Sequence, residues 1–207
     1  MAEGFAVRGV PGMRVLIACE FSGTVRDAFL ALGHDAISCD LLPTERPGPH
    51  HQGDVLPLLE EQWDLMIAFP PCTDLAASGA KWFHEKRRDG RQQRAVDFFR
   101  ALADAPIPRV AVENPVGVMS TLYRKPDQIV HPWQFGDVAE KRTCFWLRGV
   151  RLLRPTEIVD RGPRHVTKSG RSLPKWYNLP PSPERAKIRS RTFPGLARAM
   201  AEQWGQP

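Results

Sequence analysis

Residues 63–83 read WDLMIAFPPCTDLAASGAKWF, and this stretch decides the fold. Its apolar run LMIAF at 65–69 is typical of a strand that is buried on both faces of a parallel sheet. Pro70 and Pro71 end the run, because proline cannot donate to a sheet ladder. Cys72 follows directly, so the pattern predicts a thiol at the carboxyl end of a buried strand, where α/β proteins place reactive groups. From this stretch alone, a buried structural cysteine is an equally good interpretation.

The composition favours one intracellular domain. With 207 residues and 42% hydrophobic residues, the chain is long enough for a sizeable core. No apolar run approaches about 18 residues, so we expect no membrane span. The four cysteines show no CxxC spacing and no histidine partners at zinc-ligand intervals, which predicts a reduced chain without a metal site. Residues 1–12 lack an apolar signal core and are interpreted as a short loose leader.

The charge is concentrated at one end of the chain. Residues 1–140 hold 14 Lys and Arg against 19 Asp and Glu, a net charge of −5. Residues 141–207 hold 15 against 4, a net charge of +11, which together give the total of +6. A basic end on a slightly acidic body suggests a polyanionic partner such as nucleic acid. A solvated basic tail is the alternative.

Strand and helix patterns alternate along the chain, which predicts an α/β fold with a mostly parallel sheet and helices on both faces. Predicted strands lie at 14–19, 35–39, 63–69, 108–112, 128–134 and 143–147, and predicted helices at 25–32, 92–103 and 196–204, with short helical segments at 56–61 and 116–123. The Pro/Gly-rich segment 42–53 is expected to be a loop. The Pro/Arg-rich segment 154–191 is expected to be extended or locally disordered.

Three predicted strand ends carry polar groups that parallel strands would bring to one edge of the sheet. The first is the turn at 20–24, which contains Gly23. Asp40 follows the next predicted strand, a position at which an acid can hydrogen-bond the ribose of a nucleotide-like cofactor. The second is Cys72, and the third is Glu113 followed by Asn114. A thiolate paired with a carboxylic acid suits attack on a pyrimidine: the thiolate adds to carbon 6 while the acid contacts ring nitrogen 3. Carbon 5 then becomes nucleophilic and can accept a methyl group.

At this point the sequence resembles the DNA cytosine-5 methyltransferases over most of residues 14–149. The resemblance rests on five short blocks in the family's order: CEFSG at 19–23, GDV at 53–55, AFPPC at 68–72, VENP at 112–115 and FGDVAEKRTCFWLRG at 135–149. It implies a Rossmann-like methyltransferase fold, S-adenosylmethionine as cofactor, and a cytosine that leaves the DNA stack. The expected location is the cytoplasm of a bacterial or phage-infected cell.

The resemblance also implies a role for each matching residue. Cys72 would be the nucleophile, Glu113 the acid and Asn114 a brace for the loop. The implied cofactor-binding residues are Glu20, Phe21, Ser22, Gly23, Asp40, Asp54 and Pro70. The implied DNA-binding residues are Pro71, Lys81, Lys141 and Arg142, and the turn at 193–195 would close the cofactor pocket.

Several departures from the family's pattern shape the domain prediction. The turn at 20–24 keeps one glycine, and the Gln-x-Arg-x-Arg pattern is reduced to Glu140-Lys141-Arg142-Thr143. We expect a catalytic domain at 13–150, a basic segment at 151–190 in place of a full target-recognition domain, and a C-terminal helix at 191–207 that packs back on it. This matches a compact, phage-type enzyme, expected as a monomer with low sequence specificity.

Two alternatives stay open at this stage. One is the same chemistry on RNA or a free nucleotide, or with a donor that carries more than a methyl group. The other is a non-catalytic nucleic-acid-binding relative that keeps the fold. Retention of both Cys72 and Glu113 argues against the second alternative.

Overall fold

A seven-stranded sheet forms the centre of the protein, whose computed structural model describes residues 12–175 and 182–206. The strand order is β3-β2-β1-β4-β5-β7-β6. The parallel strands are β1 (Arg14–Ala18), β2 (Asp35–Asp40), β3 (His50–Gln52), β4 (Leu65–Ala68) and β5 (Arg109–Asn114). Strand β7 (Thr143–Arg148) runs antiparallel to both β5 and β6 (Gln128–Val130). This is a Rossmann-like α/β fold with a mostly parallel sheet and helices on both faces, as the sequence predicts.

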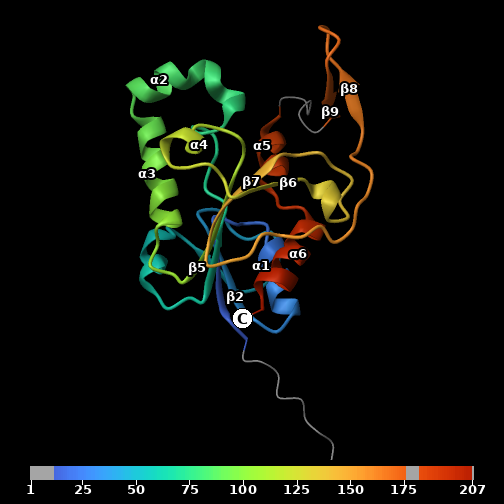
Figure 1. Cartoon of the computed structure of the whole chain (residues 1–207). Helices are drawn as coiled ribbons and strands as arrows, with labels where there is room; N and C mark the ends of the chain where they lie inside the picture. Colours follow the sequence, from blue (N-terminus) through green and yellow to red (C-terminus); the bar gives the residue numbers. More distant parts are fainter. Residues whose placement is uncertain (1–11, 176–181, 207) are drawn as a thin grey trace, which may run out of the picture.

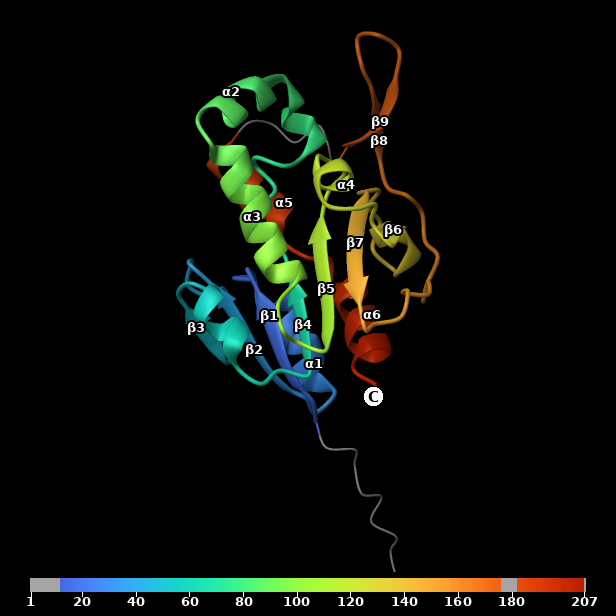
Figure 2. The same ribbon diagram turned by 60° about the vertical axis from the view of Figure 1, so that its left-hand side comes forward.

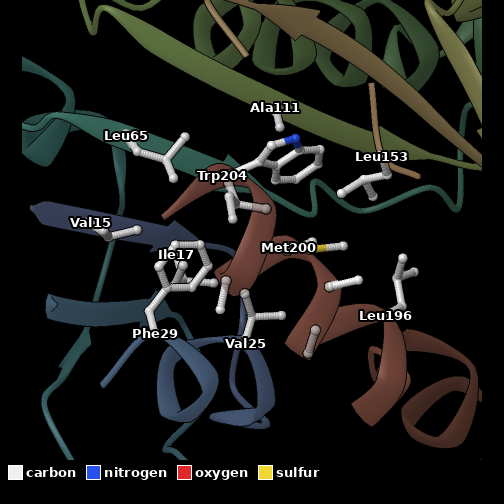
Figure 3. Close-up of a cluster of buried hydrophobic side chains, with 14 of the residues drawn as sticks. Val15, Ile17, Val25, Phe29, Leu65, Ala111, Leu153, Leu196, Met200 and Trp204 are labelled. Carbon is white, nitrogen blue, oxygen red and sulfur yellow. The ribbon is translucent and has the colours of Figure 1, made fainter. Parts of the chain in front are cut away.

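Helices cover both faces of the sheet (Figure 1, Figure 2). On one face, α1 (Thr24–Ala31) and α6 (Pro194–Trp204) pack against each other and against alternate strand residues such as Val15 and Ile17. Figure 3 shows this core, in which Trp204 and Met200 of α6 meet Phe29 and Val25 of α1. On the other face, α3 (Arg91–Ala103) and the 3-10 helix η1 (Leu56–Glu60) contact the remaining strand residues. Burial on both faces explains why the strands read as continuous apolar runs.

The smaller elements gather at the end of the sheet where β4 and β5 finish (Figure 2). They are η2 (Ala77–Trp82), α2 (Phe83–Arg88), α4 (Met119–Leu122), η3 (Pro132–Gln134), the hairpin β8 (Arg164–Val166) and β9 (Ser172–Pro174), and α5 (Pro183–Ser190). In the described parts of the chain, no helix is long and apolar enough to cross a membrane. The expected leader at 1–12 lies outside the described residues except for Gly12.

Four secondary-structure predictions need correction. Segment 42–53 is not all loop, because β3 joins β2 through backbone bonds at the sheet edge, where no apolar pattern is needed. The strand predicted at 128–134 ends at Val130, because Pro132 begins η3. Segment 154–191 contains the β8–β9 hairpin and α5. Helix α6 begins two residues earlier than expected, with Pro194 at its first position.

Candidate active site

Cys72 lies on a loop that leaves β4 at the carboxyl edge of the sheet. β4 is fully buried, whereas Cys72 as a whole residue is exposed, although neighbouring loop atoms shield its sulfur from part of the solvent. The amide Nδ2 of Asn114, at the end of β5, donates to the Pro70 carbonyl at 3.0 Å. The Cys72 carbonyl accepts from the backbone amides of Leu75 and Ala76. These bonds fix the backbone on both sides of the thiol.

Two side chains that the sequence did not single out hold the next part of this loop. Lys86, a buried residue of α2, donates to the Thr73 carbonyl at 2.5 Å and lies 3.3 Å from Asp74 Oδ1. Gln92 of α3 is also buried and donates to the Asp74 carbonyl at 3.2 Å. The charged segment at 81–94 therefore does more than form a solvated surface. The sequence around Lys86 and Gln92 shows no pattern that predicts burial of either side chain.

Glu113 lies on β5, the strand next to β4, with its side chain 12% exposed. In the described part of the chain, its buried Oε1 has no hydrogen-bond partner. The nearest cation is Lys141, whose Nζ lies 4.0 Å from Oε1. Burial raises the pKa of Glu113, and the Lys141 ammonium opposes that rise only in part. A buried carboxyl with an unused oxygen is suited to hold a proton and to contact a ligand.

Glu113 acts on the Cys72 thiol electrostatically. The pKa of the Cys72 thiol is raised first by burial and then by the Glu113 carboxylate, whereas Lys141 and Arg189 lower it. Arg189 belongs to α5, whose backbone also accepts from Lys141: Nζ lies 3.5 Å from the Arg189 carbonyl. The pKa of the thiol thus responds to one acidic side chain and to two cationic side chains. The first helical residue after the thiol is Ala77 of the 3-10 helix η2.

The other predicted DNA-binding residues differ in position. Pro71 and Lys81 are exposed, and the Lys81 ammonium lies 4.9 Å from the centre of the Trp82 ring. Arg142 is exposed and acts on the pKa values of Cys144 and His131. Of the two cations in the Glu140–Thr143 block, Lys141 is therefore the one that faces Glu113. Arg189 was missed because α5 was not predicted, although Ser182 before Pro183 is a helix-start signal.

The turn after β1 is organised by Glu20. Its buried carboxylate accepts from the backbone amides of Val25, at 2.9 Å, and Arg26, at 3.4 Å, and from the Ser22 hydroxyl at 2.8 Å. Gly23 precedes α1 with φ near +71°, a conformation that favours glycine. Phe21 is buried beside this turn. Glu20 thus occupies amides at the start of α1.

Asp40 and Asp54 lie together at the ends of β2 and β3. The Gly53 amide donates to the Asp40 carbonyl. Burial raises the pKa of the thiols of Cys19 and Cys39, and the carboxylates of Asp40 and Asp54 raise it further. One oxygen of each carboxylate accepts a hydrogen bond from the backbone: Asp40 from the Leu42 amide and Asp54 from the Leu56 amide. In the described residues, the second oxygen of each carboxylate has no protein partner, so both can accept from hydroxyl or amino groups.

The block at 135–137 holds the C-terminal helix. Asp137 accepts from the Leu196 amide at 3.2 Å, and Gly195 packs so closely that a Cβ there would lie 1.9 Å from the Phe135 carbonyl oxygen. The turn at 193–195 is therefore fixed against the loop that leads to Lys141. Within residues 12–175 and 182–206, no group of three or more His, Cys, Asp or Glu side chains could hold a metal ion.

Comparisons with known proteins add little beyond the backbone arrangement. No protein-family description and no curated protein matches the chain. One matching crystal structure is a protein provisionally described as a DNA modification methyltransferase encoded within a prophage (E. coli). The identity is 16% and the TM-score is 0.48, and the match covers 73% of this chain. It spans only 53% of the other protein, so this chain covers about half of that length. What this chain does is therefore inferred from its own residues.

Proposed function

We propose that this protein transfers a methyl group from S-adenosylmethionine to carbon 5 of cytosine in DNA through a covalent Cys72 adduct. One observation carries the proposal. An exposed cysteine follows β4, a buried carboxyl with an unused oxygen lies at the end of the adjacent parallel strand β5, and the carboxylate raises the pKa of the thiol. A nucleophile and an acid on one side of a pyrimidine are what addition to carbon 6 requires.

Cys72 and Glu113 would set the protonation states that the addition to carbon 6 requires. Cys72 loses its proton to solvent and its sulfur bonds to carbon 6, while protonated Glu113 donates a hydrogen bond to ring nitrogen 3. Because the Glu113 carboxylate raises the pKa of Cys72, a proton on Glu113 makes the thiolate easier to form. After carbon 5 has gained its methyl group, it loses its proton to solvent. The sulfur–carbon bond then breaks and the thiolate is released.

S-adenosylmethionine would supply an electrophilic methyl group when bound. The residues at the ends of β1, β2 and β3 fit its nucleoside part: Asp40 and Asp54 offer free carboxylate oxygens, and Phe21 offers an apolar contact. Ser22 and Gly23 shape the turn beside them, and Pro70 lies where β4 ends. Because Glu20 occupies the first amides of α1, the carboxylate of the cofactor would bind away from them.

Nucleoside mass spectrometry after incubation with labelled cofactor tests the proposal. Purified protein is incubated with duplex DNA, duplex RNA or dCMP, and the digested product is analysed for 5-methylcytosine. We expect labelled 5-methyldeoxycytidine from DNA with the wild-type chain and none with Cys72→Ala. Cofactor binding, measured by calorimetry, should persist in that variant.

Cys144→Ala is the matched control, because it removes the same sulfur from a position next to Glu113. Cys144 is 1% exposed and burial raises its pKa to about 11, so it is no nucleophile at neutral pH. This variant should keep its activity. Full methyl transfer by Cys72→Ala, or product only from RNA or dCMP, would overturn the proposal as stated.

A further inference from the structure

Helix α5 lies beside the candidate active site but takes little part in the hydrophobic core. Figures 1 and 2 show it at the end of the sheet where β4 and β5 finish. None of its described side chains belongs to either buried cluster, and Ile188 is 38% exposed. The helix has eight residues, and an isolated helix of that length is only marginally stable in water. Polar contacts must therefore fix its position.

One polar contact joins α5 to Glu113 through Lys141. The Lys141 ammonium donates to the Arg189 carbonyl at 3.5 Å, and it lies 4.0 Å from Glu113 Oε1. It thus lies between the last turn of α5 and the end of β5. The Arg189 guanidinium and Lys141 lower the pKa of Cys72, whereas Glu113 raises it. A single contact of 3.5 Å is too weak to hold a helix in place.

A second contact reaches from the end of α5 to a distant loop. Arg191, the C-cap residue of α5, forms a bidentate ion pair with Glu45. The two nitrogen–oxygen distances are 2.9 Å, from Nε to Oε2, and 2.7 Å, to Oε1. The partners are 146 positions apart in the sequence. A bidentate pair fixes orientation as well as distance, which distinguishes it from most surface ion pairs.

Glu45 itself lies on a fixed backbone. The fully buried Arg26 guanidinium donates to the Thr44 hydroxyl at 3.2 Å and to the Arg46 carbonyl at 3.1 Å. The neighbours on both sides of Glu45 are therefore held. The Glu45 amide also donates to the Phe21 carbonyl at 2.9 Å, which joins this loop to the turn after β1. Glu45 can thus serve as an anchor for α5.

We infer that Arg191 is a positioning residue of the candidate active site, because its ion pair with Glu45 holds the carboxyl end of α5 in place. Held there, α5 keeps the Arg189 guanidinium beside Cys72. Arg191 therefore acts on the thiol through Arg189. The inference rests on the proposed function, which makes Cys72 the nucleophile, but its own measurement needs no methyl transfer.

Glu45→Gln is the variant that distinguishes positioning from a simple charge effect. Loss of a carboxylate would by charge alone favour the Cys72 thiolate and speed its alkylation. Loss of the anchor instead releases Arg189, which disfavours the thiolate and slows alkylation. Iodoacetamide labelling of the Cys72 peptide, followed by mass spectrometry over a range of pH, measures the rate. We expect alkylation at pH 8 to become several-fold slower, with the rate profile moved to higher pH.

Glu61→Gln is the matched control. It makes the same chemical change in a carboxylate that lies 3.6 Å from Arg14, at the amino end of β1. Its alkylation rate at Cys72 should equal that of the wild type. Circular dichroism and the denaturant midpoint check that each variant is folded.

Two double variants test whether the effect passes through α5. Glu45→Arg with Arg191→Glu restores an ion pair of opposite direction and should recover most of the wild-type rate. Glu45→Gln with Arg189→Gln should be no slower than Arg189→Gln alone, because the anchored cation is already absent.

Alkylation of folded Glu45→Gln at the wild-type rate or faster would overturn the inference. So would a slowing that persists in the charge swap, or one that adds in full to that of Arg189→Gln. Methyl transfer is scored separately. Its absence from the wild-type chain would contradict the proposed function and leave the alkylation result readable.

Discussion

At the scale of single residues, the protonation of Cys72 depends on the charge of Glu113. Burial raises the pKa of both groups, and the Glu113 carboxylate raises that of Cys72 further. The free protein therefore holds Cys72 as a thiol at neutral pH, and ionisation becomes easier when Glu113 carries a proton. Holding Cys72 as a thiol protects its sulfur from unproductive reactions.

The rate of Cys72 alkylation by iodoacetamide reports this coupling. Glu113→Gln removes a negative charge, so the pKa of Cys72 should fall and alkylation at pH 8 should become several-fold faster. Arg189→Gln removes a positive charge and should have the opposite effect. Methyl transfer should decline in both variants. Equal alkylation rates in all three proteins would contradict the coupling.

At the scale of elements, the loop after β4 is held by α2 and α3. Lys86 and Gln92 bind its carbonyl groups from buried positions, so the thiol is presented by a fixed backbone. The first turn of α1 and the loop at 44–49 are joined in a similar way by Arg26. Its fully buried guanidinium donates to six groups, namely Asp27, Ser38, Thr44 and the carbonyls of Arg46, Pro47 and Pro49.

Lys86→Met should destabilise the protein by about 2 kcal/mol, because it removes a charge-assisted hydrogen bond from a buried carbonyl. Denaturant unfolding measures this loss. Arg88→Met, at an exposed position of the same helix, is the control and should stay within about 0.5 kcal/mol of the wild type. Wild-type stability in Lys86→Met would show that the lysine does not hold the loop.

Arg26→Met should cost about 3–5 kcal/mol, because the six acceptors lose their donor. The expected readouts are a lower denaturant midpoint and faster proteolysis within residues 44–49. Arg46→Met removes a half-exposed guanidinium that makes one distant ion pair with Asp27, and it should change the midpoint little. Similar midpoints for the two variants would be incompatible with this role of Arg26.

The sequence predicts the elements whose side chains carry a burial pattern. The apolar runs at 14–19, 65–69 and 109–112, and the period of α1 and α3, follow directly from two-sided burial. Strand β3, the β8–β9 hairpin and α5 lack such a pattern, since backbone bonds and surface contacts hold them. For the same reason Cys72 and Glu113 could be proposed from strand ends, whereas Lys86 and Arg189, which lie on α2 and α5, could not.

At the scale of the whole molecule, the charge is divided between two regions. The body at 1–140 carries −5 and the segment at 141–207 carries +11, and the structure gives much of that segment a defined form. From this segment, Lys141 acts on the pKa of both Glu113 and Cys72, and Arg189 of α5 acts on that of Cys72. The basic end is thus part of the candidate active site and not a separate tail.

Glu113 should lower the stability of the whole protein at neutral pH. Because its folded pKa is raised above the unfolded value, the native state binds the proton more tightly and stability falls as pH rises between the two values. Glu113→Gln should therefore raise Tm at pH 8, by about 2–4 °C for each kcal/mol of penalty removed. The gain should shrink toward pH 4, and scanning calorimetry at both pH values measures it. A gain that is the same at both values would contradict the raised pKa.

Covalent trapping tests the central claim most directly. The protein is incubated with S-adenosylmethionine and duplex DNA in which 5-fluorocytosine replaces cytosine, and the products are analysed by intact mass and peptide mapping. We predict a denaturation-resistant protein–DNA adduct joined through Cys72, formed also by Cys144→Ala and absent from Cys72→Ala. Tight binding of this DNA without any adduct, or an adduct on another residue, would contradict the account.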